Sequence, residues 1–145
     1  MKIYQFVFDS EEQLLHYYYK GEALIRKGYP FFLPNTSSEE CYVAYPSLLV
    51  RIGRTGREVA SRFSHRYING LGVGFDIVHQ NLLCNLIAAR LPWSEAVAFE
   101  YAAAGMIEDR SLDEGELQPS YYLEWRDCTL EVTETMIRKA VERMS

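Results

Sequence analysis

Apolar and polar residues alternate with the period of a β-strand in several parts of the chain. Between residues 2 and 8, Ile3, Gln5 and Val7 share one face, and three aromatic residues share the other. This alternation predicts a first strand that is buried on at least part of each face. The same pattern predicts strands over residues 41–52, 70–78 and 116–132.

Helical spacing is found in three other stretches. Ser10 and Gln13 have the spacing of a capping box, which predicts a helix over about residues 11–25. Within it lies a run of three tyrosines, Tyr17 to Tyr19. Because helical neighbours point about 100° apart, these rings cannot converge on one substrate, and packing is the favoured interpretation. Further helices are predicted over residues 79–90 and, after a Thr133 cap, over the last ten residues.

The final predicted helix carries an apolar stripe that needs a partner surface. The stripe consists of Ile137, Ala140, Val141 and Met144, which recur at the i, i+3, i+4 and i+7 spacing.

The middle of the chain is punctuated by glycines. Gly53 and Gly56 predict a turn, with a return strand starting at Glu58 and Val59. Residues 62–67 predict a short helical turn. Glycines at 70, 72 and 74 leave one face of the next strand bare, so another backbone or a ligand must approach that face closely. Their spacing does not match a dinucleotide-binding loop.

Composition narrows the class of protein. At 145 residues, 48% hydrophobic, the chain is expected to form one domain over residues 1–145. A net charge of −5 gives no basic face for nucleic acid, and no apolar run is long enough to cross a membrane. The three cysteines fit neither a zinc motif nor a disulfide framework, so we expect a cytoplasmic protein.

Several of these segments, in this order, resemble the fumarylacetoacetate hydrolase family. They are PFFLP, LLVRIGRTGREVASRFSHRYINGLGVGFD and ARLPWSEAVAFEYAAAG, and together they cover about residues 28–105. The resemblance is to bacterial members that act as isomerases or hydrolases of unsaturated diacids. It implies an α+β fold, a mixed β-sheet or β-roll of the family's C-terminal-domain type with flanking helices. In the family a further closing segment follows the last helix, so the resemblance implies a truncated version.

The resemblance also implies chemistry that depends on Mg²⁺, Mn²⁺ or Ca²⁺ held by two glutamates and one aspartate, since hard cations prefer carboxylate oxygens. A lysine assists the reaction in the family. In this sequence the aspartate is retained as Asp76, but the two glutamates correspond to Tyr45 and Ser47, and the lysine corresponds to Val97. Asp76 alone would not hold a divalent ion, so no cofactor is expected unless other acids rebuild the site. Otherwise Asp76 is expected to cap the next helix or pair with an arginine such as Arg62 or Arg66.

Three functions follow from this comparison. The first is a degenerate, non-catalytic relative that binds a small molecule or a partner. The second is an active metal-dependent hydrolase, isomerase or decarboxylase of small oxo-diacids. Its candidate acids are Asp76, Glu100 and Glu39 or Glu40, and its candidate base is His65 or His79. For His65 the structural alternative is a packed side chain, and for His79 a solvent-facing residue at a helix start. The third is an interaction subunit that pairs with a complete family member.

Association is also expected, because the family resemblance and the stripe on the last helix both favour a homodimer.

Overall fold

The computed structural model describes residues 1–26, 28–30, 39–110, 112 and 117–145. Most of the PFFLP segment lies outside these residues. The chain divides into two compact units, each assembled from three separate segments. The first unit comprises residues 1–5, 17–45 and 74–105, and the second comprises residues 6–16, 46–73 and 106–145.

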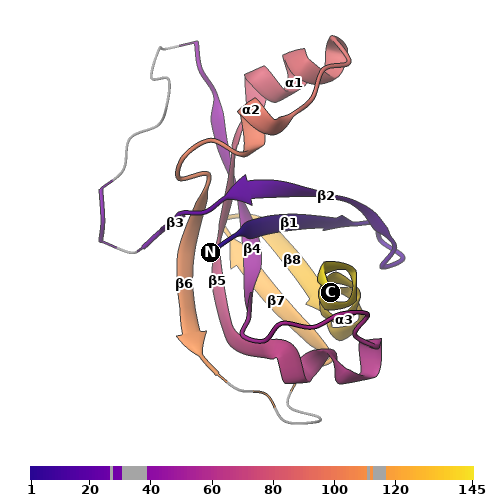
Figure 1. The fold of residues 1–145 in the computed structure, drawn as a ribbon. Helices are drawn as coiled ribbons and strands as arrows, with labels where there is room; N and C mark the ends of the chain where they lie inside the picture. The colour runs from indigo at the N-terminus through magenta and orange to yellow at the C-terminus, as the bar shows by residue number, and fades with distance from the viewer. Residues whose placement is uncertain (27, 31–38, 111, 113–116) are drawn as a thin grey trace. The chain divides into compact units, whose positions relative to one another are not determined.

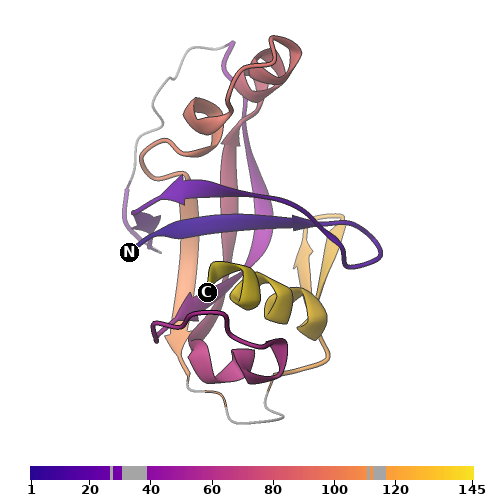
Figure 2. The ribbon, with the colours of Figure 1, turned by 45° about the vertical axis from the view of Figure 1, so that its right-hand side comes forward.

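The strands of the described residues form three sheets (Figures 1 and 2). A four-stranded sheet has the order β3 (Leu24–Ile25), β6 (Ala103–Asp109), β5 (Ile68–His79) and β4 (Tyr42–Ile52). β3 and β6 are parallel, with Leu24 opposite Ala103. β1 (Ile3–Phe8) pairs with β2 (Leu14–Gly21), and β7 (Ser120–Trp125) pairs antiparallel with β8 (Cys128–Thr133). Mixed sheets with few helices confirm the α+β prediction.

The helices are short. They are the 3₁₀ helix η1 (Ser61–Tyr67), then α1 (Gln80–Ala88), α2 (Ser94–Val97) and α3 (Glu134–Met144). The helical predictions for residues 62–67, 79–90 and the C-terminal segment are therefore confirmed. Thr133 caps α3 as expected, because its Oγ1 accepts a hydrogen bond from the Met136 amide at 3.3 Å. None of the helices in the described part of the chain could cross a membrane.

The predicted helix over residues 11–25 is wrong, since Leu14 to Gly21 form strand β2. Asp9, rather than Ser10, organises the local chain: its Oδ1 accepts hydrogen bonds from the Glu11 and Gln13 amides, both at 2.9 Å. Such an aspartate turn reverses the chain and pairs β2 with β1 instead of starting a helix. Aromatic residues in the run that follows favour a strand.

The predicted return strand at Glu58 and Val59 is also wrong. The backbone of Glu58 has a φ of +51°, which no strand allows, and η1 follows instead. Val59 is 6% exposed, and its amide donates to Ser145 Oγ at 3.0 Å. The chain therefore passes the C-terminal end of α3 before it forms η1 and β5.

Gly72 explains the glycine spacing of β5. A Cβ atom at this position would lie 1.8 Å from the Met106 carbonyl oxygen and 2.7 Å from Ile107 Cα. The bare face of β5 thus receives the backbone of β6, and the predicted close approach is confirmed within the second unit.

Each unit has its own apolar cluster. In the first unit the cluster is small and consists of Val78, Ala96 and Val97, with Leu82, Leu83 and Leu86 of α1 packed against it. In the second unit β5 packs with α3 and residues that follow β6. Ile137 and Val141 of the predicted stripe are 4% and 5% exposed, whereas Met144 remains 43% exposed. The members of the second cluster are Ile68, Leu71, Leu112, Leu117, Ile137 and Val141.

Candidate functional site

Strand β2 sorts the tyrosine run onto two faces. Tyr17 and Tyr19 are 37% and 39% exposed, whereas Lys20, one residue further on, is 2% exposed. Because side chains alternate along a strand, Tyr18 and Lys20 share the buried face. An ammonium group is costly to bury, so Lys20 requires a partner.

That partner is Asp76 of β5, which is 6% exposed. Lys20 Nζ lies 2.5 Å from Asp76 Oδ1 and donates a hydrogen bond to the Ile77 carbonyl oxygen at 2.7 Å. The Tyr18 hydroxyl donates to the other carboxylate oxygen, Oδ2, at 2.7 Å. Oδ1 accepts no hydrogen bond of regular geometry from the described residues, so the ammonium is what balances its charge. We call Tyr18, Lys20 and Asp76 the lysine–aspartate cluster.

Aromatic rings complete the surroundings of the ammonium. Lys20 Nζ lies 5.8 Å from the centroid of the Tyr18 ring and 5.9 Å from that of Phe99. Burial lowers the pKa of Lys20, and the Asp76 carboxylate opposes this shift. Burial also raises the pKa of the Tyr18 hydroxyl well above its usual range, and the Asp76 charge raises it further. Tyr18 is therefore a neutral hydrogen-bond donor to a charged acceptor.

A second polar cluster joins the start of β4 to the start of α1. His79 Nε2 donates a short hydrogen bond to Glu40 Oε2, and Asn81 Nδ2 donates to the same oxygen at 3.0 Å. Tyr42 stacks on the His79 ring with centroids 4.4 Å apart. The hydrogen bond from Asn81, followed by that from His79, lowers the pKa of Glu40. The Asn81 Oδ1 atom also accepts from the Cys41 amide at 3.0 Å, which fixes the helix start to the strand.

Solved structures share this architecture, although neither a family model nor a curated protein matches the sequence. A Burkholderia cenocepacia protein described as a fumarylpyruvate hydrolase has a TM-score of 0.69, with 16% identity over 100% of this chain and 69% of its own. Fumarylpyruvate hydrolase from Pseudomonas aeruginosa, solved with Mn²⁺ and pyruvate, has a TM-score of 0.68, with 15% identity over 90% of this chain and 60% of its own. A 5-carboxymethyl-2-hydroxymuconate delta-isomerase from Mycobacterium smegmatis has a TM-score of 0.59, with 13% identity over 99% of this chain and 61% of its own.

The chain has the fumarylacetoacetate hydrolase fold. At 13–16% identity these similarities establish the fold alone. The chain spans 60–69% of the length of these three neighbours.

The residues present do not fit the metal that the fumarylacetoacetate hydrolase resemblance implies. In the described ranges, no three His, Cys, Asp or Glu side chains are grouped in a way that could hold a metal ion. Asp76 is already paired with an ammonium. Tyr45 is 45% exposed, and its hydroxyl donates to Gln80 Oε1 at 2.9 Å. Ser47, at the position of the second glutamate, supplies only a neutral hydroxyl and is 8% exposed.

The other candidate residues are dispersed. His65 is 3% exposed in η1 of the second unit, as the packed alternative predicts, and its Nδ1 has no hydrogen-bond partner among the described residues. His79 is 8% exposed, so the solvent-facing alternative is wrong. Glu100 is exposed in the connection between α2 and β6. Val97, at the position of the family lysine, is 2% exposed in an apolar cluster.

The predicted partners of Asp76 also need correction. Arg62 and Arg66 belong to the second unit, where their guanidinium groups lie 4.6 and 4.7 Å from the centroid of the Phe63 ring. The cation beside Asp76 is Lys20. Sequence reasoning missed it because a helix was assigned to residues 11–25, which separated Tyr18 from Lys20 by about 200°. Strand alternation over the same residues would have placed Tyr18 and Lys20 on one face.

Proposed function

We propose that this chain is a non-catalytic protein with the fumarylacetoacetate hydrolase fold, which acts by binding a partner rather than by metal-assisted chemistry. One observation carries the proposal: the single retained acid, Asp76, is buried against Lys20 and Tyr18. A divalent ion that polarises a substrate carbonyl needs several carboxylate oxygens and open coordination positions. Asp76 offers neither, because both of its oxygens face partners from β2.

The test is an activity assay with fumarylpyruvate and related acylpyruvates in the presence of Mg²⁺ or Mn²⁺. The Pseudomonas aeruginosa fumarylpyruvate hydrolase serves as the positive control. We expect no turnover above the uncatalysed rate, and no calorimetric binding of Mn²⁺ tighter than about 100 μM, since one carboxylate is a weak site. Metal-dependent turnover that disappears in Asp76→Asn would contradict the proposal and support the oxo-diacid hydrolase or isomerase.

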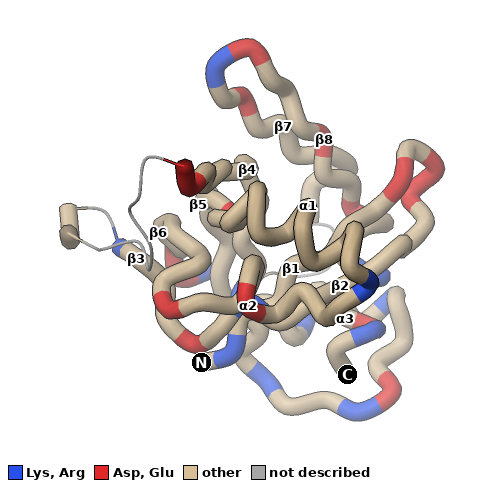
Figure 3. The backbone as a smooth tube through the Cα atoms, turned by 90° about the horizontal axis from the view of Figure 1, so that it is seen from above, with Lys and Arg blue, Asp and Glu red and all other residues tan. Residues whose placement is uncertain are grey.

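The partner we propose is a second copy of the chain, bound through the β7–β8 hairpin. In the register of the hairpin Leu123 faces Leu130 and Trp125 faces Cys128, so these four side chains share one face. Trp125 and Leu130 are 42% and 38% exposed. The charged residues that Figure 3 marks along the hairpin are Arg126 and Asp127 at the tip, and Glu124 and Glu131, which the register assigns to the other face. A two-stranded hairpin is marginally stable alone, so covering this face favours both the hairpin and the dimer.

Sedimentation velocity at micromolar concentration tests the dimer. We expect the wild type to sediment as a dimer and Trp125→Ser with Leu130→Ser to sediment as a monomer. Tyr122→Ser is the matched control, because Tyr122 is 66% exposed on the opposite face of the hairpin. A monomeric wild type would contradict the homodimer. Co-purification with a longer fumarylacetoacetate hydrolase relative from the native host would also contradict the homodimer and would support an assembly of the two proteins.

The size of one hollow bears on a small-molecule function. A hollow in the second unit, lined by Ile52, Val59, Tyr67, Val141 and Met144 among others, encloses about 40 Å³. Pockets for organic ligands usually enclose about 300–1,000 Å³. This hollow is thus too small for an oxo-diacid.

A further inference from the structure

A buried carboxylate on β5 needs a positive charge, whichever group supplies it. Asp76 is 6% exposed, and its partners have apolar or aromatic neighbours: Lys20 lies near the Phe99 ring, and Tyr18 packs against the Val78 cluster. An isolated ionised carboxylate in such a place is strongly disfavoured. In a metal enzyme the cation would neutralise the carboxylate, so the loss of the metal has to be compensated.

The Lys20 ammonium supplies the positive charge that Asp76 requires. Its ammonium has three N–H groups and three sets of neighbours: Asp76 Oδ1 at 2.5 Å, the Ile77 carbonyl oxygen at 2.7 Å, and the faces of two aromatic rings. These are oxygen and π-face contacts that a cation prefers. With 1% of its side chain exposed, the ammonium is closed to solvent and to any substrate.

The position of the ammonium also excludes a divalent ion. A Mg²⁺ or Ca²⁺ ion lies about 2.0–2.6 Å from its ligand oxygens, which is the shell that Lys20 Nζ fills beside Oδ1. The Tyr18 hydroxyl donates to Oδ2 and, as a neutral donor, offers no negative charge to a metal. An ion that entered would lie against the positive charge beside Oδ1 or displace the Tyr18 hydrogen bond at Oδ2.

We infer that the Lys20 ammonium replaces the divalent cation at Asp76 and makes this version of the fold independent of metal. The inference rests on the proposed function only in assuming that no divalent ion binds Asp76. Lys20 and Asp76 then stabilise the fold only as a pair. Neutralising either residue leaves the other as an unpaired buried charge, whereas neutralising both together leaves a shape-matched neutral pair.

A double-mutant cycle tests the coupling between Lys20 and Asp76. It compares the thermal denaturation of the wild type, Lys20→Met, Asp76→Asn and the double variant at pH 7. We expect each single substitution to lower Tm by about 10 °C or more, and the double variant to recover at least half of the larger loss. The same cycle at Arg51 and Asp109, an exposed pair, is the matched control and should show almost no recovery. Additive losses at Lys20 and Asp76 would overturn the inference.

If either single variant fails to fold, a folded double variant is the expected rescue, and an unfolded double variant counts against the inference. Wild-type protein labelled at lysine provides a second measurement by NMR. Titration with Mn²⁺ to about 1 mM, well above the affinity of real carboxylate sites, should leave the Lys20 signal unbroadened. Selective broadening of Lys20 would place the ion at Asp76 and overturn the inference. Turnover without such broadening would contradict only the proposed function.

Discussion

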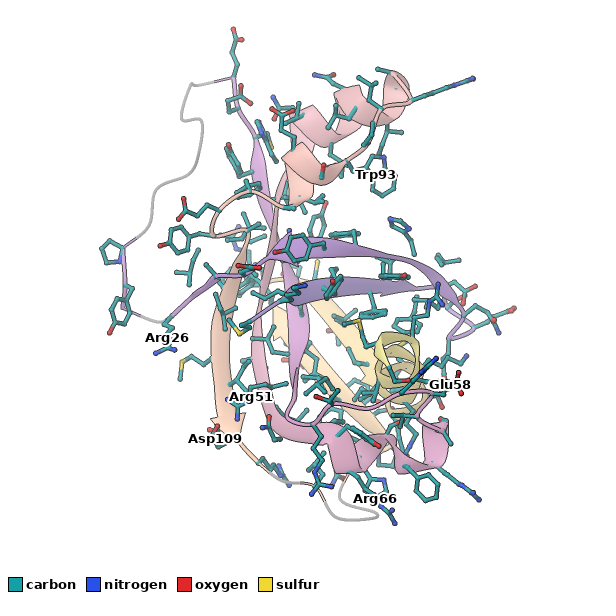
Figure 4. All side chains as sticks on the ribbon, viewed as in Figure 1. Arg26, Arg51, Glu58, Arg66, Trp93 and Asp109 are labelled. Atoms are coloured by element: carbon teal, nitrogen blue, oxygen red, sulfur yellow. The ribbon has the colours of Figure 1, made fainter. Side chains whose placement is uncertain are left out.

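Two ion pairs of this protein, each joining two strands that are not neighbours in a sheet, differ in their exposure to solvent. Arg51 of β4 donates to Asn69 of β5 and pairs with Asp109 of β6, and its Nε lies 2.7 Å from Asn69 Oδ1 (Figure 4). The Arg51 and Asp109 side chains are 35% and 89% exposed, whereas those of Lys20 and Asp76 are 1% and 6% exposed. Water can solvate either partner of the first pair when the other is lost. It cannot do so for the second pair, so the loss of one partner should destabilise the fold much more at the buried pair than at the exposed one.

Charge reversal should separate the two pairs most strongly. Lys20→Glu puts a second carboxylate beside Asp76, and we expect a loss of at least about 5 kcal/mol, comparable with the whole stability of a small protein. Asp109→Lys should cost about 1 kcal/mol, because Asp109 is 89% exposed and its replacement remains hydrated. Urea unfolding followed by circular dichroism measures both. Equal losses would contradict the distinction between the pairs.

Removal of the Tyr18 hydroxyl should have the next largest effect. Tyr18→Phe keeps the ring over Lys20 but removes the hydrogen bond to Asp76 Oδ2, which should cost about 1.5–3 kcal/mol since the acceptor is charged. Tyr17→Phe, on the exposed face of the same strand, is the control and should change stability by less than about 0.5 kcal/mol. Urea unfolding measures the stability of both variants. If Tyr18→Phe left the free energy of unfolding unchanged, the hydroxyl would not stabilise Asp76.

Acid should weaken the contacts of Glu40 with Asn81 and His79. The folded protein holds the pKa of Glu40 below its ordinary value of 4.5, through Asn81 and then His79. A depressed carboxyl pKa adds stability above pH 4.5, and this contribution disappears as the pH falls below that value. Glu40→Gln should therefore lower Tm at pH 7 by less than Tyr18→Phe does. The gap to wild type should narrow towards pH 3, and a gap independent of pH would show that the charge of Glu40 contributes nothing.

The exposed pair should give the smallest effect and the one most sensitive to salt. Asp109→Asn should cost at most about 1 kcal/mol in dilute buffer, and 1 M NaCl should remove most of this difference because the Debye length falls to about 3 Å. Asp76→Asn should keep its full cost in 1 M NaCl, since ions do not reach the buried pair. A salt-sensitive Asp76→Asn would indicate that the cluster is solvated.

Local sequence pattern predicted most of the scaffold. Strand alternation identified β1 and β4, helical spacing identified α1, and the alternating glycines anticipated the backbone of β6 against Gly72. The failure at β2 had a specific cause: a capping-box spacing at Ser10 outweighed the strand preference of three consecutive tyrosines. The aspartate turn at Asp9 favours the strand over the helix, because it reverses the chain and pairs β2 with β1.

The candidate site could be predicted only in part, because its partners are far apart in the chain. The family resemblance singled out Asp76 and implied that Tyr45, Ser47 and Val97 lack the chemistry of the family residues at their positions. It did not identify Lys20, which lies 56 positions from Asp76, or the pairing of His79 with Glu40, 39 positions away. A buried lysine is recognisable only once the face of its strand is known.

The most direct test of the central claim, that Lys20 is the cation at Asp76, is a crystal structure grown in 10 mM MnCl₂ and measured at the manganese absorption edge. We predict an ordered Lys20 ammonium within hydrogen-bonding distance of Asp76 and the Ile77 carbonyl oxygen, with no anomalous peak beside either carboxylate oxygen. A manganese peak within coordination distance of Asp76, with Lys20 displaced, would contradict the account.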